Sequence, residues 1–408
     1  MAVTEAVGGS RAAPTWRGGF GRLWTAAVVS RFGDSLRTAA LPLLAASLTD
    51  DPLLIASVTA CGFLPWLLFG LLGGAVADRV DQRRAMWAVD LVRAGLVAAF
   101  AAAVALGHVS IALLLLLAFA LTTLQTLFDN AATALLPALV PAETLAGANA
   151  RLVSGQQLAG GLLAGPAVPV LLLAGPAVPY AADAVTYVLA ALFVASLRTG
   201  APERPPRPAG STLRAEMAEG LAALRADRTL RRLCTATTLC NVGMGALIAT
   251  LVVHVTDGRP AGTAGNTAYA ATITAYALGA VAGGSPARRI AERTGRVRAV
   301  FLAGTVQTAC LVLMGAVPVL GVSIGAMAVF GLMGTVWNVQ QTTLVQERAP
   351  EGMLGRIAAA FRTLAVAGAP LGALLGGAAA AGPGPHAPAL LAAALFALAV
   401  ASLGPLIN

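Results

Sequence analysis

Long apolar runs separated by short polar segments dominate the chain. A membrane-spanning helix needs about 20 mainly apolar residues, and twelve segments of this kind can be placed along the sequence. They are 23–48, 53–77, 84–106, 109–138, 150–173, 177–197, 233–256, 266–287, 299–317, 320–345, 354–381 and 387–405. The pattern therefore predicts an all-α membrane protein with twelve transmembrane helices.

The longest polar stretch divides these segments into two sets of six. The predicted units are a tail at 1–22, a six-helix bundle at 23–197, a linker at 198–232 and a second six-helix bundle at 233–408. The two bundles echo each other, because the polar segment at 74–84 recurs as a similar hairpin near 284–296. We therefore expect two pseudo-symmetric halves.

The linker contains one segment with helical periodicity. Leu213, Met217, Leu221 and Leu224 recur at the spacing of one helix face, among several arginines. This pattern predicts a short amphipathic helix. It either lies on the anionic inner leaflet or is a solvated linker helix.

All 27 basic residues are arginine, and they are unevenly distributed between the connections. Of these, 22 fall on segments that share one side of the predicted membrane, and only Arg259 falls on the other. Arginine favours the cytoplasmic side. We therefore expect a multi-pass protein of the cell membrane with both termini in the cytoplasm.

The composition argues against several other functions. Without lysine, the chain has no phosphate-binding GK[ST] loop and no Schiff base. The arginines lie between apolar runs rather than in one patch, which argues against nucleic acid. The four cysteines are far apart, and none of the three histidines has a second ligand-type residue beside it in the sequence. We expect no metal, no cofactor and no enzymatic activity.

The polar hairpin between the second and third segments carries a recognisable motif. Residues 73–84 read GGAVADRVDQRR. This resembles the loop signature of the major facilitator superfamily, Gly-x-Leu-Ala-Asp-Arg-x-Gly-Arg-Arg, with departures at Asp81 and Gln82. Ser30-Arg-Phe-Gly-Asp34, Asp90-Leu-Val-Arg93 and residues 135–141 resemble the branch that contains macrolide-efflux proteins and the enterobactin exporter.

The resemblance implies a function and a set of roles. It implies a transporter that exports a small hydrophobic compound, a drug or natural product, by alternating access and proton antiport. It also implies a cytoplasmic gate formed by Asp78, Arg79, Arg83, Arg84, Asp129 and Arg356. There, Asp129 would meet a hairpin arginine, and Asp78 would face the start of the eleventh helix. Gly161, Gly165 and Pro166 resemble the glycine–proline bend of proton-coupled exporters.

Charged residues inside the predicted helices are the candidates for coupling and substrate binding, because such residues are costly in the membrane. Arg31, Asp34 and Arg37 are spaced i, i+3 near the middle of the first helix. Asp34 either changes protonation state during transport or is neutralised permanently by an arginine. Asp183, between two tyrosines, is either a second protonation site or a carboxylate bonded to a tyrosine. Arg362 either binds an anionic substrate or balances an aspartate of the first half.

Uncharged polar residues within the helices are candidates for lining a central cavity. They are Gln125, Gln156, Asn241, Trp337, Asn338 and Gln341. Each is either a substrate contact or an interhelical hydrogen bond. The expected partners are a small-molecule substrate, protons and lipids, and we expect a monomer. A lipid or lysolipid transporter is the alternative, and an integral membrane enzyme is a third class that the residues favour least.

Overall fold

The computed structural model describes residues 18–77, 81–136, 139–141, 144–197, 213–257, 263–350 and 353–406, and in these ranges the regular structure is helical. Helices lie over the first six predicted segments. They are α1 (Gly19–Leu48), α2 (Pro52–Ala77), α3 (Gln82–Ala105), α4 (Ile111–Leu135), the consecutive α5 (Leu145–Gln157), η3 (Leu158–Leu163) and α6 (Ala164–Ala174), and α7 (Val178–Ala195).

In the described part of the second half, the regular structure is also helical. After α8 (Leu213–Ala226) come α9 (Arg228–Thr256), α10 (Thr263–Ala282), α11 (Gly284–Thr294), α12 (Arg296–Ala316), α13 (Leu320–Arg348), α14 (Leu354–Ala381), α15 (Ala387–Leu403) and the short η4 (Gly404–Leu406). The prediction of a hairpin near 284–296 is wrong in one respect. Most of these residues form the separate helix α11 between α10 and α12. Similarly, α9 begins five residues before the predicted segment.

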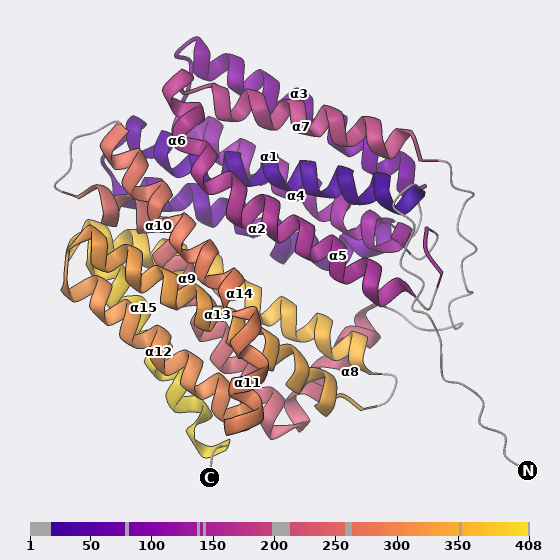
Figure 1. Cartoon of the computed structure of the whole chain (residues 1–408), viewed down its shortest axis with the longest axis vertical. Coiled ribbons are helices and arrows are strands. Elements are labelled where there is room, and N and C mark those ends of the chain that lie inside the picture. Colours follow the sequence, from indigo (N-terminus) through magenta and orange to yellow (C-terminus); the bar gives the residue numbers. More distant parts are fainter. Residues whose placement is uncertain are drawn as a thin grey trace, which may run out of the picture.

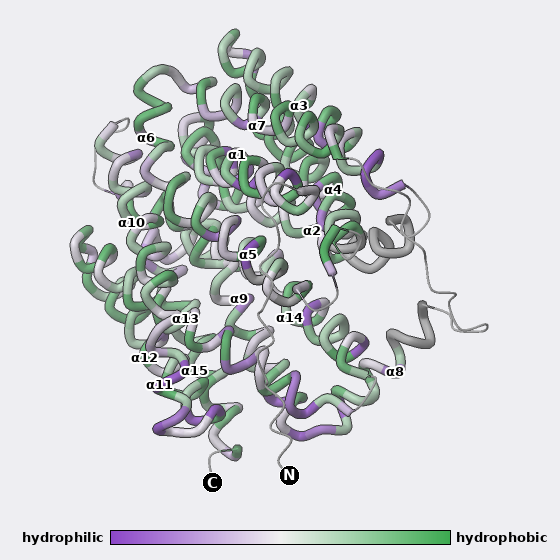
Figure 2. The backbone as a smooth tube through the Cα atoms, turned by 45° about the vertical axis from the view of Figure 1, so that its right-hand side comes forward, coloured by the Kyte–Doolittle hydropathy of each residue, from purple (hydrophilic) through white to green (hydrophobic). Residues whose placement is uncertain are grey.

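Nine helices of the described chain are long and apolar enough to cross a membrane. The other three predicted spans correspond to α1, α2 and α10, so the count of twelve stays a prediction for those helices. For α1 the reason is its charge, since Arg31, Asp34 and Arg37 all lie in its middle. Figure 2 shows that hydrophobic residues dominate the long helices, whereas α11 is hydrophilic.

Polar residues between the apolar runs fix where several helices begin. Asp81 accepts a hydrogen bond from the backbone N–H of Arg84 at the start of α3 (3.0 Å). Asp227 accepts one from Leu230 at the start of α9 (2.8 Å). Such caps satisfy backbone donors that have no partner within the helix.

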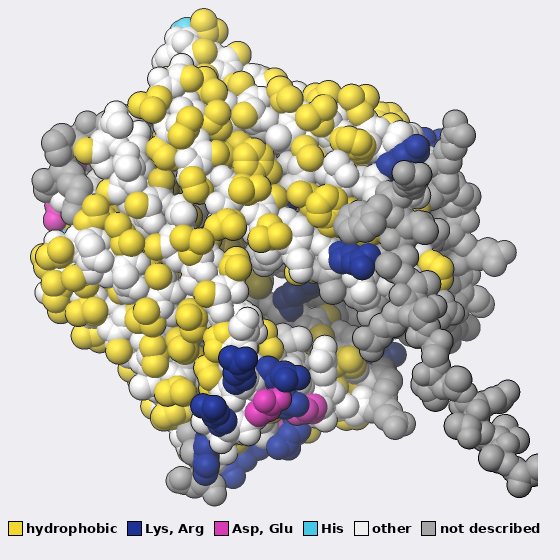
Figure 3. Space-filling model, viewed as in Figure 1, with side chains coloured by type: hydrophobic (Ala, Val, Ile, Leu, Met, Phe, Trp, Pro, Cys, Tyr) yellow, Lys and Arg dark blue, Asp and Glu magenta, His cyan; other side chains and the backbone are white. Residues whose placement is uncertain are grey.

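The helices form two halves that lie side by side, α1–α7 in one and α9–α15 in the other (Figure 1). At the end where α2 begins and α14 finishes, small residues bring the halves into contact. A Cβ atom on Gly377 would lie 2.7 Å from the Cβ of Ala56. Figure 3 shows a hollow between the halves, with arginine side chains inside and beside it.

The linker helix α8 packs against the second half. A Cβ atom on Gly220 would lie 2.5 Å from the carbonyl oxygen of Arg356, and Leu224 is buried. Glu219 forms an ion pair with Arg356 (2.5 Å). The predicted helix is therefore present, and it contacts the beginning of α14.

Candidate functional site

A network of buried charges joins α1, α3 and α7 in the first half. Its centre is Asp34, the sixteenth of the 30 residues of α1. The Oδ1 atom of Asp34 accepts hydrogen bonds from Nη2 of Arg37 (3.0 Å) and Nη2 of Arg93 (2.8 Å). The Tyr187 hydroxyl donates a third bond to the same oxygen. One carboxylate oxygen thus connects three helices.

Arg37 extends the network to a second carboxylate on α7. Its Nε atom donates to Oδ2 of Asp183 (3.0 Å), and Asp183 is fully buried. The close approach of α1 and α7 depends on Gly33, because a Cβ atom there would lie 2.4 Å from Oδ1 of Asp183. The tyrosine-bonded alternative for Asp183 is wrong in this structure, since Tyr187 donates to Asp34 instead.

Arg93 is the most connected member of the network. It is fully buried, and its Nη1 atom lies 3.2 Å from Oδ1 of Asp90. Its Nη2 atom donates to Gln125 as well as to Asp34. The guanidinium carbon also lies 4.0 Å from the centroid of the Tyr187 ring, a cation–π contact.

The network contains more carboxylates than arginines. Asp34, Asp90 and Asp183 face two guanidinium groups, those of Arg37 and Arg93. When these five groups are ionised they carry one net negative charge, in a medium that solvates charge poorly; Arg31 acts on Asp34 from outside these hydrogen bonds. In addition, Oδ2 of Asp90 has no hydrogen-bond partner in the described structure. The arrangement can therefore take up one proton and become neutral.

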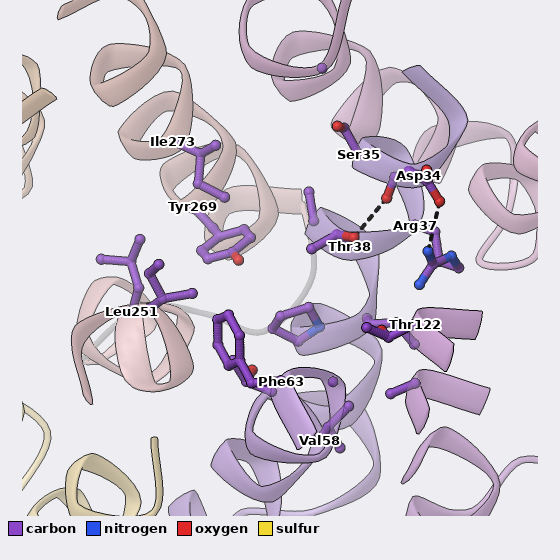
Figure 4. Close-up of a pocket in the computed structure, with 18 of the residues that line it drawn as sticks. Asp34, Ser35, Arg37, Thr38, Val58, Phe63, Thr122, Leu251, Tyr269 and Ile273 are labelled. Atoms are coloured by element: carbon purple, nitrogen blue, oxygen red, sulfur yellow. Dashed lines mark hydrogen bonds and ion pairs between the residues drawn. The ribbon is translucent and has the colours of Figure 1, made fainter. Parts of the chain in front are cut away.

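A cavity of about 430 Å³ adjoins the network. Its lining comes from both halves and includes Asp34 and Arg37 from α1 and Leu251 and Tyr269 from α9 and α10. In Figure 4, Asp34, Ser35, Thr38 and Thr122 lie on one side of the cavity, Leu251, Tyr269 and Ile273 lie on the opposite side, and Val58 and Phe63 lie below. The volume lies within the usual range of small-molecule sites, roughly 300–1,000 Å³.

A second cavity of about 100 Å³ lies in the second half. Three of the predicted cavity residues, Asn241, Trp337 and Asn338, line it. A fourth, Gln341, accepts hydrogen bonds from the Trp337 indole (2.8 Å) and from Thr237 (2.9 Å), so it holds the wall in place. Gln125 instead joins the charge network, and Gln156 is not on the lining of either cavity.

The two predicted arginines outside the network are separated from each other. Arg31 lines the larger cavity and is exposed there. Arg362 is exposed on α14 and contributes to neither cavity lining. The structure therefore brings Arg31 to Asp34 and does not bring Arg362 to either cavity.

The predicted gate residues are only partly described. Asp78 and Arg79 lie outside the described residues. The Arg83 guanidinium donates to the carbonyl of Ala195 (2.5 Å), and Arg84 lies 3.6 Å from Asp81. Gln125 donates to Asp129 (2.8 Å), while Arg356 pairs with Glu219. The gate itself stays a prediction.

The predicted bend coincides with a change in helix type. Over Leu158–Leu163, just before Pro166, the helix is π-helical, a geometry that often marks functional positions. Gly165 packs closely on α10, since a Cβ atom there would lie 2.8 Å from Oγ1 of Thr274. A Cβ atom on Gly161 would lie 3.7 Å from Ala277, also on α10. This segment therefore contacts the other half.

Two of the histidines are far apart in the sequence but meet in the structure. His254 and His386 lie with their Nδ1 atoms 3.0 Å apart, although 132 positions separate them. His386 Nε2 also lies 3.3 Å from Oδ2 of Asp257. Within the described residues, no group of three or more such side chains is arranged to hold a metal ion.

Two participants were missed as members of the site. The spacing i, i+3 of Asp90 and Arg93 predicts a local structural pair. The pair is present, but Arg93 also reaches Asp34. Tyr187 was noted only as a neighbour of Asp183. The available signal was the spacing i, i+4 of Asp183 and Tyr187, which places both on one face of α7.

Known proteins resemble this chain along most of its length. A family model described as a transmembrane secretion effector matches residues 9–407. Macrolide efflux protein A of Streptococcus pyogenes is 23% identical over 368 residues, covering 88% of this chain and 89% of that protein. The nucleoside transporter NupG superimposes with a TM-score of 0.77 at 12% identity, covering 95% of this chain and 100% of the other. A bacterial homologue of the iron transporter ferroportin in an inward-facing state gives 0.72 at 14% identity, covering 96% and 98%.

Proposed function

This chain belongs to the transmembrane secretion effector family of major facilitator transporters, and we propose that it exports a small, largely hydrophobic compound by proton antiport. The observation that carries the proposal is the position of Asp34. This residue lines the cavity between the halves and also accepts three hydrogen bonds within the buried charge network. A proton taken up by the network is therefore next to the space that a substrate would occupy.

Alternating access gives this arrangement a direction. The halves touch at the end where α14 finishes, at Gly377 and Ala56. With the arginine-bearing end in the cytoplasm, as its charge favours, we infer an inward-facing state, and we propose that the protein works as a monomer in the cell membrane. The compound enters the cavity from the cytoplasm, the gate of Asp78, Arg79 and Asp129 closes, and the opposite end opens.

Proton entry supplies sufficient energy for export. One charge that crosses 100 mV releases about 2.3 kcal/mol, and one pH unit adds about 1.4 kcal/mol. Together these support an accumulation ratio of roughly 30- to several-hundred-fold, because every 1.4 kcal/mol is a factor of ten. One added proton makes the five hydrogen-bonded groups electrically neutral. The free energy needed to keep them buried while the protein changes from one open state to the other is then lower.

Lipid or lysolipid transport is the second candidate. It is favoured by the apolar wall that α9 and α10 present to the cavity, with Leu251 and Ile273. Movement of a labelled lysolipid between the leaflets of proteoliposomes, at a rate well above that of protein-free vesicles, would support this candidate over compound export.

Export is tested by expression in a host that lacks its own efflux systems, followed by a toxicity screen. Asp34→Asn should abolish protection while the amount of protein in the membrane stays the same. Glu292→Gln is the matched control, because Glu292 pairs with Arg288 on the exposed face of α11. Equal protection by wild type and Asp34→Asn would remove Asp34 from the mechanism.

A further inference from the structure

The larger cavity has two chemically different walls. Figure 4 shows Ser35, Thr38 and Thr122 on one side, next to Asp34 and Arg37. Leu251, Tyr269 and Ile273 face them from α9 and α10. A compound that fills this space meets hydrogen-bonding groups along one edge and apolar side chains along the other.

Of the three charged residues in this lining, only Arg31 is exposed. Asp34 and Arg37 have exposed fractions of 6% and 7%, and their charged groups are engaged within the network. Arg31 makes no hydrogen bond or ion pair with any residue in the described part of the chain. Its guanidinium group therefore offers up to five donors to whatever occupies the cavity.

The aliphatic part of Arg31 is held at the π-helical turn. A Cβ atom on Gly160 would lie 3.2 Å from Cγ of Arg31 and 2.6 Å from Oγ of Ser35. The absence of a side chain at Gly160 thus leaves room for both groups. Ser35 and Thr122 also have no side-chain hydrogen bond to the residues described here, which adds two hydroxyl groups to the same polar wall.

The apolar wall continues beyond the larger cavity. Met244 and Tyr276 line both cavities, so the two spaces share a boundary at these residues. The smaller cavity adds aromatic rings, those of Phe330, Trp337 and Phe396. An apolar or aromatic body can therefore extend from the larger cavity toward the second half.

From these observations we infer the chemical class of the substrate: an amphipathic compound that presents hydrogen-bond acceptors to Arg31 and its apolar body to α9 and α10. Carbonyl, ester, ether or carboxylate oxygens fit this edge. An organic cation does not fit, because it would meet an exposed guanidinium while the carboxylate of Asp34 is occupied by Arg37 and Arg93. This inference rests on the proposed export function and specifies its cargo.

Binding of a matched series to the purified full-length protein tests the inference. The compounds share one aryl-alkyl body and end in a methyl group, a methyl ester, a carboxylate or a primary amine. Binding is measured in detergent at one pH and without a gradient. We expect the ester and the carboxylate to bind about 10- to 100-fold more tightly than the alkane, and the amine no more tightly than the alkane.

The variant Arg31→Met should reduce ester affinity to the level of the alkane, and Arg31→Lys should restore part of it. Arg288→Met is the control for loss of one positive charge, since Arg288 is exposed on α11 and pairs with Glu292. Gel filtration and thermal unfolding establish that each variant is folded. The affinities of the compound series for the wild-type protein test the inference even if a variant does not fold. An amine that binds as tightly as the ester, an ester affinity unchanged in Arg31→Met, or no binding of any member would overturn the inference.

The result is separable from the proposed function, because binding requires no proton gradient. Preference for the ester together with coupled export that persists in Asp34→Asn would contradict the coupling mechanism alone. Coupled export together with preference for the amine would contradict the substrate class alone.

Discussion

Gly33→Ala tests whether the charge network depends on the close approach of α1 and α7. The new Cβ atom would lie 2.4 Å from Oδ1 of Asp183 and 1.9 Å from Oγ1 of Thr186. Atoms in contact are separated by about 3.5 Å, so the two helices must move apart by roughly 1 Å to clear Asp183 and by roughly 1.5 Å to clear Thr186. The contact between Arg37 and Asp183, now 3.0 Å, would lengthen to about 4–4.5 Å, at or beyond the limit of an ion pair.

The expected cost of Gly33→Ala follows from overpacking. Additional atoms in a well-packed interior destabilise a protein by about 1–3 kcal/mol. For a unit of 150–250 residues, each kcal/mol lowers the melting temperature by about 2–4 °C. Thermal unfolding of the purified protein should therefore shift down by roughly 2–12 °C, and export should fall because Arg37 loses a partner.

A matched glycine and a second-site change complete this experiment. Gly95 on α3 has open space around it, so Gly95→Ala should unfold at the wild-type temperature or slightly above it. Thr186→Ala removes the oxygen nearest to the new Cβ atom and should recover part of the loss in Gly33→Ala. If Gly33→Ala is as stable and active as Gly95→Ala, the account of α1–α7 packing is refuted.

Three further changes probe other parts of the structure. Arg93→Met leaves the buried Asp90 without its ion-pair partner and removes one partner of Asp34, and it should cost about 3–5 kcal/mol; a wild-type unfolding temperature would contradict its central place in the network. Gly377→Val should push Ala56 away and expose the closed end, which labelling of a cysteine introduced there would detect; unchanged labelling argues against this contact. Glu219→Gln removes an exposed ion pair with Arg356 and should change stability by less than about 1 kcal/mol; a large loss would show that α8 anchors α14.

The sequence predicts helix positions well because the bilayer imposes a length on each apolar run. It also predicts the pairs Asp34–Arg37 and Asp90–Arg93, because residues spaced i, i+3 lie on one helix face. These relations are local, so no knowledge of neighbouring helices is needed.

Contacts between helices could not be predicted in the same way. The bond from Arg93 to Asp34 depends on how α1 and α3 are rotated about their axes, and the bond from Tyr187 depends on the depth of α7. The pair His254 and His386 depends on where two separate helix ends meet. A glycine directly beside Asp34 was the one local signal of close packing at the network.

Proton movement coupled to export in proteoliposomes tests the central claim most directly. Wild-type protein is reconstituted into vesicles, and the compartment that receives the exported compound is made acidic. A pH-sensitive dye reports proton flux when the compound is added on the opposite side. In wild type we expect protons to move in the direction opposite to the compound. In the Asp34→Asn variant we expect no coupled proton flux, although the variant still binds the compound. Equal proton flux in both proteins, or compound export by wild type without any proton movement, would contradict the account.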